Sequence, residues 1–95
     1  MKHFSKVLLE NERVKVQETR SRPGDKSQMI ERSDRVQYFI KGGVFKRHSP
    51  DGKTEDVKVK AGEVMWRQRG AARLENVGKT EARWIAVFLK QRKKK

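Results

Sequence analysis

The strongest constraint on the fold is that strand-forming residues recur in short runs separated by turn residues. Residues 14–19 begin with apolar–polar alternation, residues 36–40 form a second such run, and helical periodicity is weak throughout. Many short runs at roughly 8–12-residue spacing are typical of β-sandwiches and barrels. We therefore expect an all-β domain.

A turn near the middle of the chain predicts a hairpin. Residues 44–48 and 55–60 flank a Ser-Pro-Asp-Gly-Lys segment at 49–53. Proline presets the first turn position and glycine tolerates positive φ, so the flanking runs are expected to pair. Residues 63–66 predict a further strand, and residues 82–89, the most apolar run, predict a central strand.

The chain length allows one compact core, so we expect a single domain over residues 1–89 followed by a basic, disordered tail at 90–95. The absence of cysteine excludes disulfide scaffolds, thiolate metal sites and cysteine nucleophiles. No apolar run approaches the ~20 residues that span a bilayer, and the first residues lack a signal-peptide core. We expect a cytoplasmic protein.

The chain carries a formal net charge of +13, from 25 basic and 12 acidic residues. Five of the basic residues lie in the 90–95 tail, so the remaining 20 still leave the body at +8. Such a charge fits a polyanion-binding surface, and equally a highly charged soluble surface. The basic residues form no dense block and few aromatics lie among them, so any polyanion binding is expected to be non-specific and salt-sensitive.

Two segments resemble the two signature motifs of the cupin superfamily. They are residues 22–43, RPGDKSQMIERSDRVQYFIKGG, and residues 62–76, GEVMWRQRGAARLEN. The hairpin, the Ala-Gly turn at 61–62 and the Glu-Asn-Val-Gly segment at 75–78 fit the same pattern, which runs from about Val7 to Leu89. The resemblance implies a double-stranded β-helix, which is a jelly-roll barrel, and small cupins commonly form homodimers.

In that family the two motifs usually carry histidines that bind a metal. Here the corresponding positions hold Ile30, Arg32 and Ala72, and Gln37 stands near the fourth-ligand position. Isoleucine and alanine donate no lone pair, and an arginine guanidinium is permanently positive. We therefore expect no metal, no other cofactor and none of the metal-dependent activities of the family.

If the family geometry applies, the three replaced positions point into the barrel. The candidate ligand-binding residues are then Arg32, Gln37, Trp66, Gln68 and Arg73. Guanidiniums beside an apolar pocket suit a carboxylate or phosphate through bidentate hydrogen bonds. A filled core with Arg32 paired to a nearby carboxylate is the alternative, because an unpaired buried arginine is costly.

The remaining chemistry-bearing residues give weaker signals. His3 and His48 are expected to be exposed surface histidines, since neither matches a motif position. Core positions are assigned to the following apolar residues: Phe39, Trp66, Trp84, Ile85, Val87 and Phe88. The run from Trp84 to Leu89 is also a candidate dimer interface, because an open sheet edge in so small a barrel needs cover.

Three interpretations follow. The first is a metal-free, catalytically degenerate cupin that binds a small anionic molecule in its barrel or serves as a scaffold. The second is a basic module that binds nucleic acid or another polyanion through its exterior. The third is a redesigned cupin from which histidines were removed and to which cations were added.

Overall fold

The computed structural model of the chain describes residues 3–90. This part contains the strands β1 (Phe4–Glu10), β2 (Val14–Ser21), β3 (Ile30–Arg32), β4 (Arg35–Lys41), β5 (Gly43–His48), β6 (Thr54–Val59), β7 (Val64–Arg67), β8 (Gly70–Asn76) and β9 (Ala82–Leu89). No helix capable of crossing a membrane occurs within residues 3–90.

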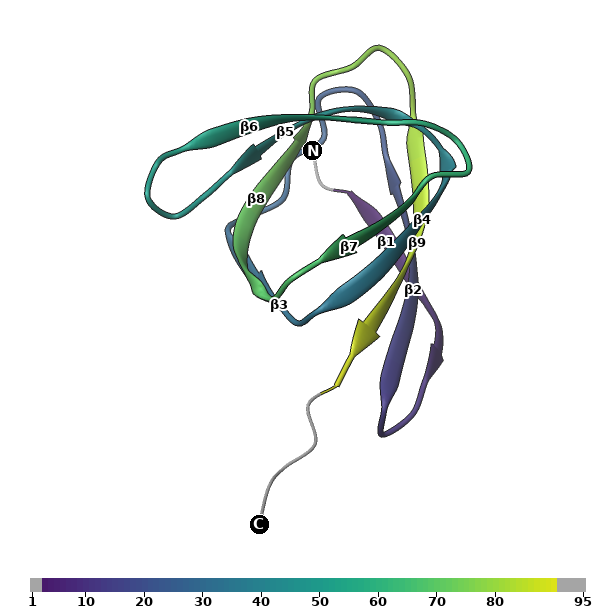
Figure 1. Cartoon of the computed structure of the whole chain (residues 1–95). Coiled ribbons are helices and arrows are strands. Elements are labelled where there is room, and N and C mark those ends of the chain that lie inside the picture. Colours follow the sequence, from purple (N-terminus) through teal and green to yellow (C-terminus); the bar gives the residue numbers. More distant parts are fainter. Residues whose placement is uncertain (1–2, 91–95) are drawn as a thin grey trace.

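The strands form two antiparallel sheets that face each other as a jelly-roll barrel (Figure 1). One sheet has the order β1-β2-β9-β4-β7 and the other has the order β3-β8-β5-β6. The predicted all-β class and jelly-roll architecture are confirmed. The predicted central position of residues 82–89 is also confirmed, because β9 pairs with β2 on one side and with β4 on the other.

The hairpin predicted around residues 49–53 forms as β5 and β6. Ser49 N donates to Lys53 O at 2.9 Å, and Gly52 takes a φ of 88°. The close approach of Gly42 to the neighbouring strand also requires glycine, because a Cβ there would lie 2.2 Å from Val59 O. This glycine lets the chain leave one sheet and enter the other within a single residue.

Three observed strands lay outside the sequence prediction. They are β1, β3 and β8. All seven residues of β1 are exposed, β3 has only three residues, and β8 includes two arginine-flanked alanines rather than alternating large apolar residues. Strand formation in these segments depends on the pairing partner more than on the local pattern.

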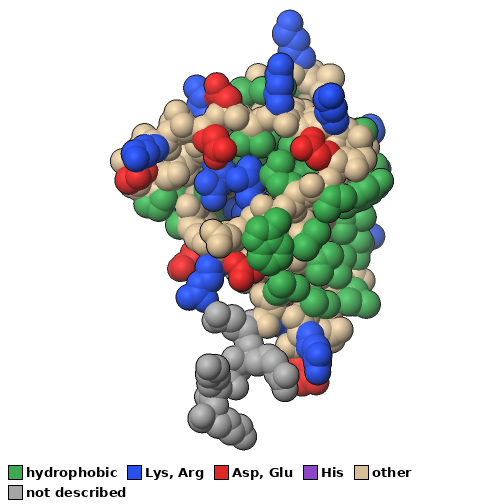
Figure 2. All heavy atoms as spheres, in the orientation of Figure 1, with side chains coloured by type: hydrophobic (Ala, Val, Ile, Leu, Met, Phe, Trp, Pro, Cys, Tyr) green, Lys and Arg blue, Asp and Glu red, His purple; other side chains and the backbone are tan. Residues whose placement is uncertain are grey.

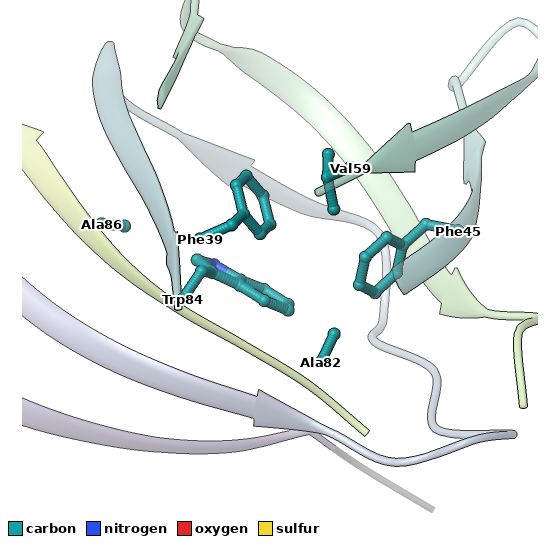
Figure 3. Packing of buried hydrophobic residues seen from close by; sticks show 6 residues of the cluster. All are labelled: Phe39, Phe45, Val59, Ala82, Trp84 and Ala86. Carbon is teal, nitrogen blue, oxygen red and sulfur yellow. The ribbon is translucent and has the colours of Figure 1, made fainter. Parts of the chain in front are cut away.

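The core joins the two sheets at one end of the barrel (Figure 3). The Trp84 ring lies 5.5 Å from the Phe39 ring in its own sheet and 5.4 Å from the Phe45 ring in the facing sheet, the latter edge-to-face. The small side chains of Ala82 and Ala86 on β9 let these rings close together. Trp84 and Phe39 therefore occupy the core positions that the sequence predicted.

The polar end of this core is held by Asn76, which is fully buried on β8. Its side-chain nitrogen donates to Ser21 O at 2.9 Å and Thr80 O at 3.2 Å, and its oxygen accepts from Gly78 N at 2.9 Å. One side chain thereby ties the end of β2 and the β8–β9 loop to the barrel wall.

Lys90, the first residue of the predicted tail, contacts the β1–β2 hairpin. Lys90 N donates to Arg13 O at 2.8 Å, and Lys90 Nζ lies 2.7 Å from Glu10 Oε2. These contacts continue the β2–β9 pairing beyond Leu89. The rest of the predicted tail, residues 91–95, lies outside the described residues.

Candidate functional site

A cavity of about 80 Å³ lies between the two sheets. Its wall contains four arginines, two glutamines, a histidine, two hydroxyl side chains and a set of apolar and aromatic side chains. These residues come from all nine described strands and the segment before β1. Among the described residues, no aspartate or glutamate lines the cavity. The cavity therefore combines high positive charge with an apolar interior.

The four arginines point inward because strand residues alternate between the two faces of a sheet. Arg35 shares its face of β4 with the buried Phe39, and Arg67 is the direct cross-strand partner of Arg35 on β7. Arg47 shares its face of β5 with the buried Phe45, and Arg32 is the last residue of β3. We refer to Arg32, Arg35, Arg47 and Arg67 as the arginine layer.

These guanidiniums lack carboxylate partners within residues 3–90. None of the four forms an ion pair there, and the single hydrogen bond is from Arg35 Nη1 to Ser33 O at 3.1 Å. Asp34 and Glu55 attract Arg35 and Arg67 over a longer distance without lining the cavity. The layer thus presents donors whose acceptors the described protein atoms do not supply.

Arg35 is the most enclosed member, with 6% of its surface exposed. Its Nε is buried without a hydrogen-bond partner. Desolvation, together with repulsion from the other three arginines, lowers the Arg35 pKa to about 10. Desolvation also lowers the pKa of Arg32 and Arg67, with Arg47 as the repelling neighbour in both cases. The layer is still fully charged at neutral pH.

The opposite end of the cavity contains the core aromatic rings. One step inward from Arg35 along β4 lies Gln37, and the next step reaches Phe39 beside Trp84. On the other sheet Arg47 is followed inward by Phe45. The four arginines therefore lie at one end and these three rings at the other, with glutamine between them.

The separation of polar from apolar side chains is not complete. Phe88 and Leu74 are the cross-strand partners of Arg35 and Arg47 at the charged end. The hydroxyls of Ser5 and Thr19 lie beside Trp84 at the aromatic end.

His3 was expected on the surface and instead forms part of the cavity wall. Its Nε2 lies 3.1 Å from Leu74 O, and its ring stands edge-on to Trp84. The bond to a carbonyl places the proton on Nε2, which leaves Nδ1 buried without a partner. Desolvation lowers the His3 pKa below 6.5, with a smaller contribution from the positive charge of Arg32.

The motif positions of the sequence do come together in space. Ala72 is the direct cross-strand partner of Ile30, and Arg32 lies two residues further along β3. Arg32, Ala72 and Gln37 line the cavity as predicted. Ile30 does not, because β3 is a short edge strand and leaves 41% of this side chain exposed.

The other predicted ligand-binding residues lie elsewhere. Trp66, which was also assigned to the core, is 52% exposed, because Met65 and Arg67 occupy the inward positions of β7 and Trp66 takes the outer one. Gln68 follows β7 on the exterior, and Arg73 lies on β8 between the inward-facing Ala72 and Leu74. None of the three lines the cavity.

His48 is half-buried rather than exposed, with Nε2 3.5 Å from Glu75 Oε1. It does not line the cavity.

The cavity contains residues that the sequence analysis did not single out, chiefly Arg35 and Arg47. The alternation of inward and outward side chains along a strand could have located them. Phe39 was predicted as core, so Gln37 and Arg35 at two-residue steps on the same strand had to face inward as well. For the N-terminal His3 the sequence contains no comparable signal, since it precedes the first strand.

The residues at the replaced motif positions do not fit a metal site. Within residues 3–90 no three histidine, cysteine, aspartate or glutamate side chains converge. The groups that do converge are guanidiniums, which repel a cation and offer it no lone pair. Of the replaced positions only Arg32 belongs to the arginine layer, whose N–H donors suit an anion and not a cation.

Comparison with known proteins identifies structural relatives. No protein-family model matches the sequence, and no curated protein matches it. The fold is similar to that of a cupin domain from Bordetella pertussis Tohama I, with 26% identity, a TM-score of 0.85 and coverage of 95% of both chains. An RmlC-like cupin family protein from Methanocaldococcus jannaschii has 16% identity and a TM-score of 0.73, over 93% of this chain and 80% of that one.

A cupin superfamily protein from Desulfitobacterium hafniense DCB-2 gives a TM-score of 0.71 at 13% identity, over 95% of this chain and 79% of that one. At this level of identity the likeness concerns the fold. The double-stranded β-helix described for the archaeal protein is the architecture found here.

We predict that Arg35→Met stabilises the protein in the absence of added anions. Removing an enclosed charge that three like charges repel should raise the free energy of unfolding by about 1–4 kcal/mol, as in replacements of buried charged groups by apolar ones. Denaturant unfolding monitored by tryptophan fluorescence measures this. Arg13→Met removes the same charge at an exposed position outside the cavity, and should have a much smaller effect. A less stable Arg35→Met would show that Arg35 is satisfied by protein groups.

We predict that His3 makes the fold sensitive to mild acid. Because its folded-state pKa lies below 6.5, the unfolded chain takes up the proton first, and the free energy of unfolding falls as pH drops from 7 through that window. His3→Gln keeps a side-chain N–H donor without the titration, so its stability should depend less on pH between 7 and 5. In His48→Gln the decrease in the free energy of unfolding between pH 7 and 5 should persist. An equal decrease in His3→Gln would contradict the assignment of this pH dependence to His3.

Proposed function

The chain is a small cupin domain, and we propose that it binds a small anionic molecule inside its barrel through the arginine layer. The observation that carries this proposal is the set of four inward guanidiniums with no carboxylate in the cavity wall. A buried charge without a partner is costly, and a cluster of four like charges is costlier. A bound anion would remove both costs at once.

The chemistry of the layer supports an oxyanion. An arginine guanidinium offers parallel N–H donors that match the two oxygens of a carboxylate or two of a phosphate. Arg35 and Arg67 are cross-strand partners, so their guanidinium groups enter the cavity from the same sheet. Those of Arg32 and Arg47 enter it from the other sheet. An anion between them would receive hydrogen bonds from both sides.

The alternative, a basic exterior that binds nucleic acid, receives less support. Four arginines are directed into the barrel and are unavailable to an extended polyanion. Exterior cations are in part paired, as in Lys41 with Glu81 at 3.8 Å and Lys90 with Glu10 at 2.7 Å. In the view of Figure 2, lysine and arginine side chains are interspersed with acidic ones and also lie within a hollow at the centre. No continuous basic stripe crosses this face.

A purely structural role also fits less well. A scaffold would fill its barrel with apolar side chains, which would stabilise the fold more than unpaired guanidiniums do. Here the wall keeps charge at a cost in stability and leaves about 80 Å³ open beside it. We assign no catalytic step, because His3 is the single histidine of the wall and no carboxylate accompanies it there.

We predict that oxyanions stabilise the protein in proportion to occupancy. At constant ionic strength, phosphate, sulfate or acetate should raise the melting temperature relative to chloride, since a ligand that binds the folded state adds RT ln(1 + [L]/Kd). Isothermal titration calorimetry should give one site per chain. Arg35→Met should weaken binding at least tenfold, the usual scale of a charge-assisted hydrogen bond.

Arg73→Met is the matched control and should bind as the unmodified chain does. Equal weakening in both variants would mean that the anions respond to net charge alone. Absence of saturable binding by any of the three oxyanions would refute the proposal. Titration with two unrelated oligonucleotides at two salt concentrations tests the alternative: tight, sequence-selective binding that survives high salt would establish it instead.

A further inference from the structure

The four arginines and the three core aromatic rings of the cavity occupy different depths. Along β4 the sequence of inward residues is Arg35, Gln37 and Phe39, so about 13 Å of strand separates the charged level from the aromatic level. On β5 the inward order is Arg47, then Phe45. A guest that satisfied the arginines alone would leave the deeper apolar wall without a partner.

Resting on the anion-binding function proposed above, we infer that the ligand is a short-chain carboxylate whose head meets the arginine layer and whose alkyl part points inward. Beyond the arginine layer the wall offers Met65 and the rings of Phe39 and Trp84, none of which bears a charge. The opposite orientation would bring a carboxylate to these groups and an alkyl chain to guanidiniums. Both placements lose hydrogen bonds.

The size of the cavity limits the chain length. A free volume of about 80 Å³ is well below the 300–1,000 Å³ typical of pockets for drug-sized ligands. Acids with a few carbons fit this volume, whereas sugars, nucleotides and long fatty acids exceed it. The glutamines at the intermediate level, Gln17 and Gln37, are the polar groups that a hydroxyl or keto substituent on such an acid would meet.

A homologous series of acids tests this inference. Calorimetric affinities for acetate, propanoate and butanoate should improve by about fourfold per methylene, equivalent to about 0.8 kcal/mol, until the cavity is full. Hexanoate should bind more weakly than butanoate. Inorganic phosphate serves as the head-only probe and should bind no tighter than acetate.

The matched variants are Met65→Gln, in the cavity wall, and Met29→Gln, on the surface. Met65→Gln is nearly isosteric and should cancel most of the butanoate advantage while leaving acetate affinity unchanged; Met29→Gln should change neither. Equal affinity for all acids and phosphate would overturn the ligand class and leave the anion site standing. Failure of every anion to bind would overturn the proposed function itself.

Discussion

The contact that the rest of the structure depends on is the packing of Trp84 against Phe39 and Phe45. It joins the two sheets at one end of the barrel, with ring centres 5.5 and 5.4 Å apart. Every second side chain of a strand points inward. The positions of these rings therefore also determine which other residues of the same strands face the cavity. The arginines at 35 and 47 face the cavity since Phe39 and Phe45 anchor their strands. The apolar end of the barrel thereby determines where its charged end lies.

The charged end works against the stability that the aromatic end supplies. Three of the four arginines have no hydrogen-bond acceptor among the described residues, and enclosure lowers the Arg35 pKa to about 10. Folded proteins retain such costs mainly at sites that bind something. Of the positions that the resemblance aligns with metal ligands, only Arg32 belongs to the arginine layer. The guanidiniums of this layer repel a cation, and they are the basis of the anion site proposed above.

The two faces of the five-stranded sheet differ in polarity. Inward, β4 presents arginine, glutamine and phenylalanine in order of depth; outward, it presents Val36 and Tyr38. The inner order separates the charged level from the core aromatic rings, and this separation is the basis of the amphiphilic guest proposed above.

The sequence by itself determined the all-β class, the hairpin around residue 51 and the central position of β9, because each depends on local pattern. Only the tertiary structure decided that Trp66 faces outward, that Arg73 lies off the cavity and that His3 lines it. Each of these depends on which face of a paired strand meets the opposite sheet. That choice is made by long-range packing of the aromatic core, which a one-residue change of register would reverse.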